Sequence, residues 1–295
     1  MKVFITGSSA HLARALLPRL CAHPAVTQVT GIDIRAAHFT HAKFSPTHLD
    51  IRAAQLANHM ENHNILINMA FRVLRGRMSE AAMSDVNING GQNVFRAARA
   101  AGITRLIHLS SAAVYGSGEN LNEDTPLAPL PGFLYGQHKA RLERWLAAEF
   151  PQCARLRPHA ILGPNAQPLL KWLLRQPCHL RLPEPAPRLQ CVHEDDVAEA
   201  VLLAMQSAVR GPLNLATADS FSFRDAIRAR HRVSVPLPVS MARATLSTAW
   251  KISGWGGEPA WIDGLTRNLT LDCRRAQAEL GWRSSCSAAQ ALAQT

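Results

Sequence analysis

Short apolar runs that alternate with helical patterns are the feature of this sequence that most constrains its fold. Such runs occupy residues 2–6, 26–33, 64–70 and 106–110, with helical patterns between them. A strand that is covered on both faces has a continuous apolar sequence, and parallel strands need long crossovers, usually helical, to connect them. The alternation therefore predicts an α/β fold: a doubly wound parallel sheet, Rossmann-like, with a small C-terminal lobe.

Three polar side chains follow the last of these runs. Ser111 comes directly after it, at the carboxyl end of the predicted strand, where open α/β sheets place their ligands. Tyr135 and Lys139 are four residues apart in a helical pattern, so they share one helix face. A lysine ammonium beside a phenol lowers the phenol pKa, because it favours the phenolate. The set predicts that Ser111 holds a substrate oxygen and that Tyr135 exchanges a proton with it.

These residues resemble the pattern of the extended short-chain dehydrogenase/reductase family, also called the NAD-dependent epimerase/dehydratase family. The resemblance runs from residue 2 to about residue 282, and residues 272–282 are similar to the family's closing D-x-S-[KR]-A…L-G-W segment. In that family the asparagine of an N-V-x-G-T segment, here residues 87–91, helps to order the active site. The residues that the resemblance implies to be catalytic are Ser111, Tyr135, Lys139 and Asn87.

A glycine-containing turn follows the first predicted strand. Residues 6–13 read Thr-Gly-Ser-Ser-Ala-His-Leu-Ala, at the place where this fold sets a pyrophosphate on a helix N-terminus. The family pattern is T-G-x-x-G-x-x-G, of which only Gly7 is kept, because Ala10 and Ala13 replace the later glycines. Those glycines permit close approach of the backbone to the pyrophosphate and close helix packing, so the replacements bear on cofactor affinity.

Asp33 ends the second predicted strand. A carboxylate there accepts hydrogen bonds from the adenosine ribose and repels a 2′-phosphate, which predicts NAD as the cofactor. Arg35 could meet such a phosphate, so NADP stays open. Asp50 and Ile51 resemble the family's D-[IV]-R segment at the adenine, although Asp50 could equally cap a helix over 52–61. The predicted cofactor contacts are Gly7, Ser9, Ala10, His11, Leu12, Asp33, Arg35, Asp50, Ile51, Met69, Ala70, Lys139 and Pro158.

A basic loop follows the strand predicted at 64–70. Its arginines either clamp a substrate phosphate or carboxylate, or form a solvated surface, and the sequence leaves both open. The segment between Pro164 and Arg188 is shorter than in sugar-nucleotide epimerases, which disfavours a bulky nucleotide-sugar substrate. Family dehydratases carry an Asp-Glu pair directly after the catalytic Ser or Thr, where this chain has two alanines. The substrate-binding candidates are Arg72, Arg75, Ala112 and His159.

The sequence thus predicts an NAD(P)-dependent oxidoreductase or epimerase. It would act at a secondary alcohol or ketone carbon of a small substrate, sugar-derived or anionic, and the sequence does not choose between epimerase and dehydrogenase. The alternative is a non-catalytic nucleotide-binding sensor or scaffold, which the missing glycines favour and the Ser-Tyr-Lys set opposes. The predicted division places residues 1–160 and parts of 188–217 in an NAD(P)-binding domain, with residues 161–187 and 218–295 in a small substrate-binding lobe.

Charge and composition limit the partners. The net charge of +11 comes mostly from single arginines rather than basic runs, which predicts solvated helix faces and no nucleic-acid surface. No apolar run is long enough to span a bilayer, and the N-terminus lacks a secretory pattern, so we expect no membrane association. The six scattered cysteines are typical of free thiols in a reducing cytoplasm, the expected location.

Three further patterns lead to predictions about ions, assembly and the C-terminal part. His193, Asp195 and Asp196 could suggest a metal site, but acids there are expected to cap a helix that begins near Val197, with no metal. Alanine-rich faces in 79–101 and 133–150 predict that these helices pair with those of a second copy to form a homodimer. If both faces cover the chain's own sheet, the protein is a monomer instead.

Residues 238–255, with Trp250 and Trp255, predict a lid or core helix of the C-terminal lobe.

Overall fold

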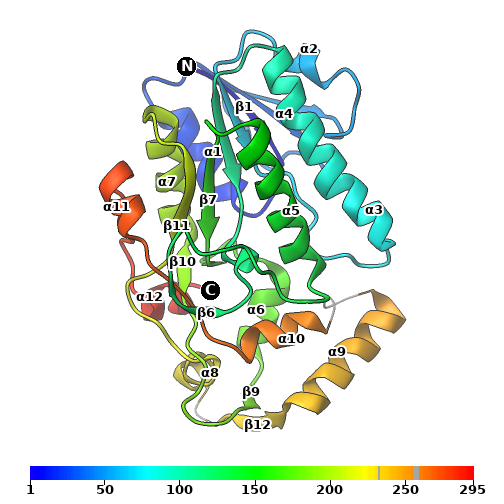
Figure 1. Cartoon of the computed structure of the whole chain (residues 1–295), viewed down its shortest axis with the longest axis vertical. Helices are drawn as coiled ribbons and strands as arrows, with labels where there is room; N and C mark the ends of the chain where they lie inside the picture. The colour runs from blue at the N-terminus through cyan, green and yellow to red at the C-terminus, as the bar shows by residue number, and fades with distance from the viewer. Residues whose placement is uncertain (232, 255–258) are drawn as a thin grey trace.

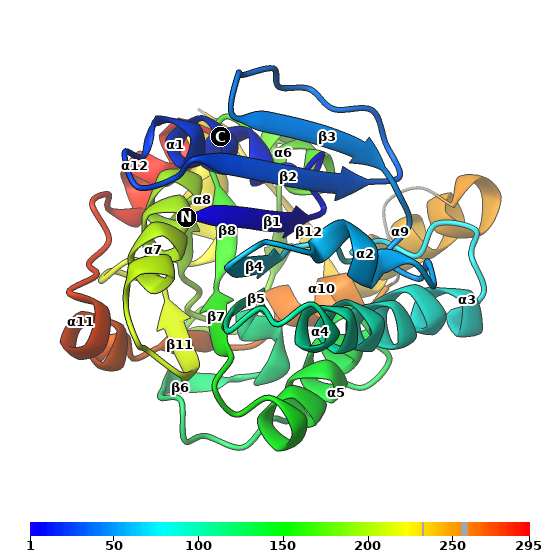
Figure 2. The ribbon, with the colours of Figure 1, turned by 90° about the horizontal axis from the view of Figure 1, so that it is seen from above.

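The computed structural model describes residues 1–231, 233–254 and 259–295. Its centre is a seven-stranded parallel sheet with the order β11-β7-β5-β4-β1-β2-β3, seen in Figure 2. The chain builds the sheet outward from β1 in both directions, which confirms the doubly wound fold, and the direction reverses between β1 and β4. Ligands bind at such a switch point, beyond the carboxyl ends of the strands. The strands are β1 (Lys2–Thr6), β2 (Gln28–Asp33), β3 (Phe44–His48), β4 (Ile65–Asn68), β5 (Arg105–Leu109), β7 (Ala154–Pro158) and β11 (Gly211–Leu215).

Helices cover both faces of the sheet, because successive strand side chains point to opposite sides. In β1, Val3 and Ile5 join one apolar cluster and Phe4 joins the other. The first cluster packs under α1 (Ala13–Ala22), α7 (Glu194–Gln206) and α11 (Arg274–Leu280). The second packs under α2 (Leu56–Met60), α4 (Gly91–Ala100) and α5 (Leu134–Glu149). The two helical layers lie on either side of the strands in Figure 2.

A third apolar cluster lies below the carboxyl ends of the strands (Figure 1). It includes side chains from five helices: α6 (Pro168–Arg175), α8 (Phe223–Arg230), α9 (Val239–Ser253), α10 (Ala260–Leu265) and α12 (Ala288–Ala293). The short strands pair as β8 (Ala160–Leu162) with β10 (Cys191–His193), β9 (Cys178–Arg181) with β12 (Val235–Pro238), and β6 (Gly118–Leu121) with β13 (Leu269–Leu271). The division into 1–160 with parts of 188–217 and 161–187 with 218–295 stays a prediction.

The long helix predicted at 79–101 is divided into three parts. It begins as α3 (Glu80–Ser84), continues as a six-residue π-helix at Asp85–Gly90, and ends as α4. A Cβ on Gly90 would lie 2.8 Å from the Ile51 side chain, so the backbone approaches its neighbour closely there. π-Helical turns inside helices occur often at functional sites, and this one contains Asn87.

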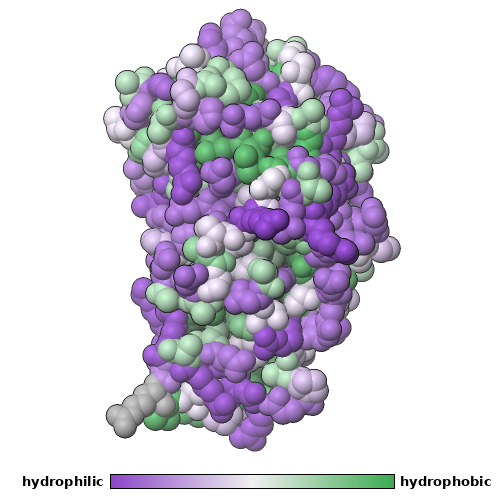
Figure 3. All heavy atoms as spheres, turned by 90° about the vertical axis from the view of Figure 1, so that its left-hand side faces the viewer, coloured by the Kyte–Doolittle hydropathy of each residue, from purple (hydrophilic) through white to green (hydrophobic). Residues whose placement is uncertain are grey.

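The helix predicted at 238–255 is α9, and Trp255 lies outside the described residues. The Trp250 indole donates to the Gly76 carbonyl at 3.1 Å, so α9 packs against the basic loop that follows β4. No helix in the part of the chain that the structure describes is long and apolar enough to cross a membrane. The side of the molecule that carries α7 and α11 in Figure 1 is mainly hydrophilic (Figure 3), as the prediction of solvated helix faces requires.

Candidate active site

The structure brings the predicted Ser-Tyr-Lys set together at one cavity. Ser111 follows β5 and caps the 3₁₀ turn Ala112–Val114, its hydroxyl accepting from the Ala113 N–H at 3.2 Å. Tyr135 and Lys139 lie in the first part of α5. All three line a cavity of about 390 Å³ between the strand ends and the C-terminal helices. The predicted residues that line this cavity are Ala10, His11, Leu12, Met69, Ser111, Ala112, Tyr135, Lys139, Pro158 and His159.

The expected effect of Lys139 on the Tyr135 phenol is not found. Burial raises the pKa of Tyr135 above its ordinary value, and a hydrogen bond with Ser111 opposes this only in part. The Lys139 Nζ is 5.9 Å from the centre of the Tyr135 ring and donates instead to the Leu109 carbonyl at 2.5 Å. In this arrangement Tyr135 is a protonated phenol at neutral pH, which suits a proton donor to a substrate oxygen.

Lys139 is a buried lysine whose charge is poised near neutral pH. Burial lowers the pKa of its ammonium to about 7, and the nearby Glu143 carboxylate opposes that shift. Its Nζ also lies 3.8 Å from the centre of the Phe71 ring, a cation–π contact that partly replaces water. Lys139 is therefore held between the end of β5 and the loop after β4, beside Tyr135.

A buried ionic network behind Lys139 was not predicted. The Arg157 guanidinium donates to both Glu143 oxygens, at 3.0 Å from Nε and 2.6 Å from Nη2. Its Nη1 donates to the Tyr115 hydroxyl at 2.6 Å, and that hydroxyl donates to Asn214 at 2.8 Å. The signal for Glu143 was present in the sequence, because it lies four residues after Lys139 on the same helix face.

The turn after β1 retains the shape that a pyrophosphate needs. Gly7 has φ +75°, and a Cβ there would lie 2.7 Å from the Ala70 backbone nitrogen, so no other residue fits. The Ala10 N–H donates to the Gly7 carbonyl at 2.9 Å, and α1 begins at Ala13 despite its missing glycine. The first N–H groups of α1, at Ala13, Arg14 and Ala15, donate to carbonyls of the turn, and the positive end of the helix dipole still favours an anion there.

The surroundings of this turn are electropositive. Burial lowers the pKa of His11, and the positive charges of Arg35, Arg14 and Lys171 lower it further. A site with this backbone geometry and this charge fits the phosphates of a dinucleotide. The residues present therefore fit the predicted cofactor.

Asp33 is fixed beside the turn at the end of β2. Its Oδ2 accepts from the Ser9 N–H at 3.0 Å and its Oδ1 from the Arg35 N–H at 2.9 Å. The Arg35 side chain also folds onto this carboxylate, with Nε 3.4 Å from Oδ1. These three hydrogen bonds still leave a lone pair on the carboxylate for a further donor.

Asp50 has a different local role from the predicted helix cap. α2 begins at Leu56, not near residue 52, so the predicted N-cap role is wrong. The carboxylate instead accepts from Arg52 through the backbone N–H and both sides of the guanidinium, which lowers its pKa. The Ile51 side chain is buried against Gly90. The adenine contact of Asp50 and Ile51 stays a prediction.

Asn87 is buried and holds the loop after β4. Its Oδ1 accepts from the Arg72 N–H at 2.7 Å and its Nδ2 donates to the Arg72 carbonyl at 3.0 Å. The same loop supplies Phe71 to the cavity, next to Tyr135. Asn87 thus positions a wall of the site through backbone contacts, without lining the cavity itself.

The arginines of this loop do not line the cavity. The Arg72 Nε donates to the Leu74 carbonyl at 2.9 Å. Arg75 pairs with Glu80 at 3.1 Å and lies 4.5 Å from the centre of the Trp250 ring. The Arg77 guanidinium donates to the Ile252 carbonyl at 2.8 Å. The predicted substrate clamp is therefore not formed here, because Arg75 and Arg77 secure the loop against α9.

His159 lines the cavity as a neutral imidazole. Its Nδ1 accepts from the Ala160 N–H at 2.7 Å, so its Nε2 carries the proton and donates to the Leu269 carbonyl at 3.0 Å. Burial lowers its pKa to about 4. Both ring nitrogens are thus paired within the protein, and only the apolar ring face is available to a ligand.

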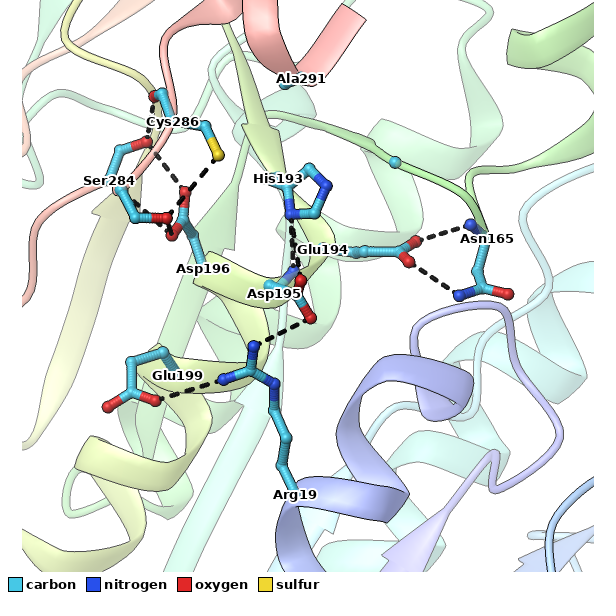
Figure 4. A network of polar contacts seen from close by, with 12 residues as sticks. Arg19, Asn165, His193, Glu194, Asp195, Asp196, Glu199, Ser284, Cys286 and Ala291 are labelled. Atoms are coloured by element: carbon cyan, nitrogen blue, oxygen red, sulfur yellow. Dashed lines mark hydrogen bonds and ion pairs between the residues drawn. The ribbon is translucent and has the colours of Figure 1, made fainter. Parts of the chain in front are cut away.

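The acidic segment after β10 is divided among separate partners (Figure 4). His193 caps α7, whose first turn contains the three acids, so the helix begins at Glu194 rather than near Val197. Asp195 pairs with Arg19 at 3.1 Å, and Asp196 accepts from Ser285 Oγ at 2.6 Å. The remaining carboxylate, Glu194, accepts from the backbone and side chain of Asn165. The predicted placement of these acids at a helix N-terminus is confirmed, but the predicted capping role is wrong, because the cap is His193.

The fold resembles solved structures along its whole length. A UDP-glucose 4-epimerase from Thermotoga maritima, solved with UDP-glucose, superposes with a TM-score of 0.78 and 17% identity. The match covers 100% of this chain and 97% of that chain. At this identity the similarity shows the fold alone.

Two sequence relatives are reductases. The chain is 28% identical over 178 residues to a 2-alkyl-3-oxoalkanoate reductase from Shewanella oneidensis, covering 55% of this chain and 45% of that protein. It is also 29% identical over 158 residues to a 4-hydroxy-2-methyl-3-oxo-4-farnesyl-3,4-dihydroquinoline-1-oxide ketoreductase from Stigmatella aurantiaca. That match covers 49% of this chain and 44% of that protein. The match covers about half the length of each of these two reductases, and 57% of an uncharacterised relative from Sinorhizobium fredii.

The family model matches more than half of the chain. It covers residues 3–216, which include the glycine turn, Ser111, Tyr135 and Lys139. The expected dependence on NAD is confirmed at the level of the family. The chain belongs to the NAD-dependent epimerase/dehydratase family.

Proposed function

We propose that this protein is an NAD-dependent ketoreductase or alcohol dehydrogenase. The observation that carries the proposal is the convergence of Ser111, Tyr135 and Lys139 on one cavity beside the dinucleotide turn. The two reductases among its relatives support the same reaction type. The test is NADH-dependent ketone reduction that disappears in the Tyr135→Phe variant.

The roles of the side chains follow from their protonation states. NAD(H), when bound, supplies or accepts the hydride at the substrate carbon. Ser111 orients the substrate oxygen by a hydrogen bond, and the protonated Tyr135 donates its proton to that oxygen in the reductive direction. Lys139 does not lower the pKa of the resting phenol, but when protonated it places a positive charge 5.9 Å from the centre of the Tyr135 ring, which favours the phenolate that forms as Tyr135 gives up its proton.

Dehydration does not fit the cavity. Ala112 and Ala113 occupy the positions after Ser111, and both line the cavity with methyl groups. A dehydratase needs an acid or base near a leaving hydroxyl, and alanine supplies neither. Epimerisation uses the same three residues and is the second candidate, favoured by the family description.

We expect NAD to bind more tightly than NADP. The Asp33 carboxylate lies beside the turn, and its charge repels a 2′-phosphate, while Arg35 is already paired with it. At equal concentration NAD should raise the melting temperature more than NADP, since tighter binding to the native state stabilises it more. In Asp33→Asn the difference should shrink or reverse. A larger shift with NADP in the unmodified protein would contradict the prediction.

We also propose a homodimer, although fewer alanines are exposed to a partner than the sequence pattern suggested. Ala97 and Ala98 are buried within the chain's own second cluster, so they are not available to a partner. The alanines that remain exposed on the two helices are Ala81, Ala100, Ala147 and Ala148. Light scattering at micromolar concentration should give twice the chain mass of 32.2 kDa, and a single species of monomer mass would rule the dimer out.

A further inference from the structure

The part of the cavity beyond Tyr135 is lined mainly by hydrocarbon side chains. α6 contributes a stripe of leucines, Leu169, Leu170, Leu173 and Leu174, while its Lys171 and Arg175 lie outside the lining. Leu265 of α10, Leu269 of β13 and Leu292 of α12 line the same space. Leu174 and Leu292 belong to the apolar cluster of the C-terminal helices, and Leu170, Leu265 and Leu269 pack against it, so the cavity opens into that cluster.

Aromatic rings surround the proton donor itself. The Tyr135 ring lies 5.6 Å from Phe71, 5.8 Å from Phe133 and 6.1 Å from Trp261, measured between ring centres. The Trp261 ring is nearly parallel to Tyr135, at 26°, and packs edge-on against Phe133 at 4.9 Å. A substrate carbon that approaches Tyr135 therefore contacts aromatic faces on several sides.

Several of the polar side chains that line the cavity near this apolar part already have partners within the protein. The Gln190 amide donates to the Thr217 carbonyl and accepts from the Leu271 N–H. Both Glu194 oxygens accept from Asn165, and both His159 nitrogens have backbone partners. A sugar hydroxyl buried here would lose its hydrogen bonds to water without gaining equivalents, which is costly.

Beyond the dinucleotide turn, the cavity also lacks the charge that the diphosphate of a nucleotide-sugar substrate needs. Among the residues that the structure describes, no arginine lines it, and Lys139 is the one lysine that does. Arg72 and Arg75, the predicted anion clamp, are outside the lining. A buried pyrophosphate without cationic partners is strongly disfavoured.

We propose that the substrate is an uncharged ketone or secondary alcohol whose reacting carbon carries a hydrophobic chain or ring. The oxygen meets Ser111 and Tyr135 at the polar end of the cavity. The hydrocarbon part extends between the α6 leucines and Trp261. This inference rests on the proposed reductase function and specifies its substrate class.

A series of ketones of increasing chain length tests the proposal. With NADH and 2-hexanone, 2-octanone, 2-decanone and 2-dodecanone, kcat/KM should rise about three- to fourfold for each added methylene until the cavity is filled, the fold-change expected for burying one methylene group. UDP-glucose in the presence of NAD should give no turnover above background. A flat series, or UDP-glucose turnover above that of every ketone, would overturn the proposal.

Two variants distinguish a change in the cavity wall from a general effect of the substitution on the protein. Leu173→Asn places an amide in the apolar wall and should reduce the dependence on chain length, with its largest loss for 2-dodecanone. Ile252→Asn makes the same kind of change at a side chain that is 71% exposed on α9, and should leave the series unchanged. Equal losses for all ketones in Leu173→Asn would count against the proposed position of the chain.

A binding measurement distinguishes failure of this inference from failure of the proposed function. Calorimetric titration with 2-dodecanone should show binding that weakens in Leu173→Asn but not in Ile252→Asn. Binding of this kind without any hydride transfer would support the apolar site and refute the reductase. Turnover of UDP-glucose without binding of 2-dodecanone would support an oxidoreductase and refute the apolar site.

Discussion

The Tyr135→Phe variant is expected to lose turnover by about two or more orders of magnitude, the usual scale for a general acid–base group. The substitution removes the hydroxyl that exchanges a proton with the substrate oxygen and keeps the ring. That ring packs against Phe71, Phe133 and Trp261, so the walls of the cavity should be preserved. Steady-state rates with a ketone and NADH measure the effect.

The second tyrosine of the chain provides the matched control. Tyr115 is buried in the ionic network, where its hydroxyl pairs with Asn214 and Arg157. Tyr115→Phe removes the same atom, so it should cost about 1–3 kcal/mol of stability, because it leaves buried polar partners unsatisfied. Its turnover at a temperature where it is folded should stay within a few-fold of the unmodified protein.

Normal NAD binding together with a reduced kcat would identify Tyr135 as the acid–base residue. Tyr135→Phe should bind NAD normally, with an unchanged thermal shift, while its kcat falls. Turnover within a few-fold of the unmodified protein would show that another group transfers the proton. A loss of both NAD binding and turnover would indicate a structural role for the hydroxyl instead.

Local sequence patterns were sufficient to predict the sheet and the core of the site. The apolar runs located β1, β2, β4 and β5, because a strand covered on both faces needs such a sequence. Ser111, Tyr135 and Lys139 were found because one follows a strand end and the others share a helix face. Each of these signals depends on residues close together in the chain, where spacing determines geometry.

Other parts of the site depend on contacts between distant segments. The sequence showed the charge of Arg75 but not that Trp250, on α9, would lie over its guanidinium. It showed a lysine next to a tyrosine on a helix, but not that the Leu109 carbonyl would hold that lysine. The position of Trp261 against Tyr135 requires α10 to fold back over the strand ends. Periodicity contains no information on such pairings.

The start of α2 illustrates a different failure. A helix was predicted from residue 52, since Asp50 is a suitable cap. Arg52 instead binds the Asp50 carboxylate and reaches Asp85 at 2.9 Å, which holds residues 50–52 in a turn. The Asp50 side chain is thus engaged by Arg52 rather than by a helix N-terminus, a pairing that helix propensity does not predict.

The Glu143→Leu variant is expected to lose about 3–5 kcal/mol of folding free energy, the cost of leaving a buried charge without its partner. Glu143 is 1% exposed and accepts two short hydrogen bonds from Arg157. Arg155 is also nearby, with Nε 3.9 Å from the carboxylate. Urea denaturation, followed by circular dichroism, gives the free energy of unfolding.

An exposed glutamate on the same helix serves as the control. Glu149 pairs with Arg99 at 3.8 Å, with half of its side chain exposed. Glu149→Leu should change the free energy of unfolding by no more than about 1 kcal/mol, because solvent screens an exposed pair. If Glu143→Leu were as mild as this control, the buried pair would not be a major determinant of stability.

The double variant Glu143→Leu with Arg157→Leu tests whether the cost arises from the unpaired charge. Removing both charges leaves neither member of the pair as an isolated ion, although Arg155 still loses its acidic neighbour, so the loss should be smaller than the sum of the single variants. Additive losses would mean that each side chain contributes by packing alone.

Glu143 also affects the protonation of Lys139, because its carboxylate opposes the lowering of the Lys139 pKa, which is about 7. In Glu143→Leu that pKa should fall further, so a smaller fraction of Lys139 is protonated at neutral pH. The same carboxylate therefore stabilises the fold and favours the protonated form of Lys139 beside Tyr135, which ties the stability of this protein to the proton transfer in its site.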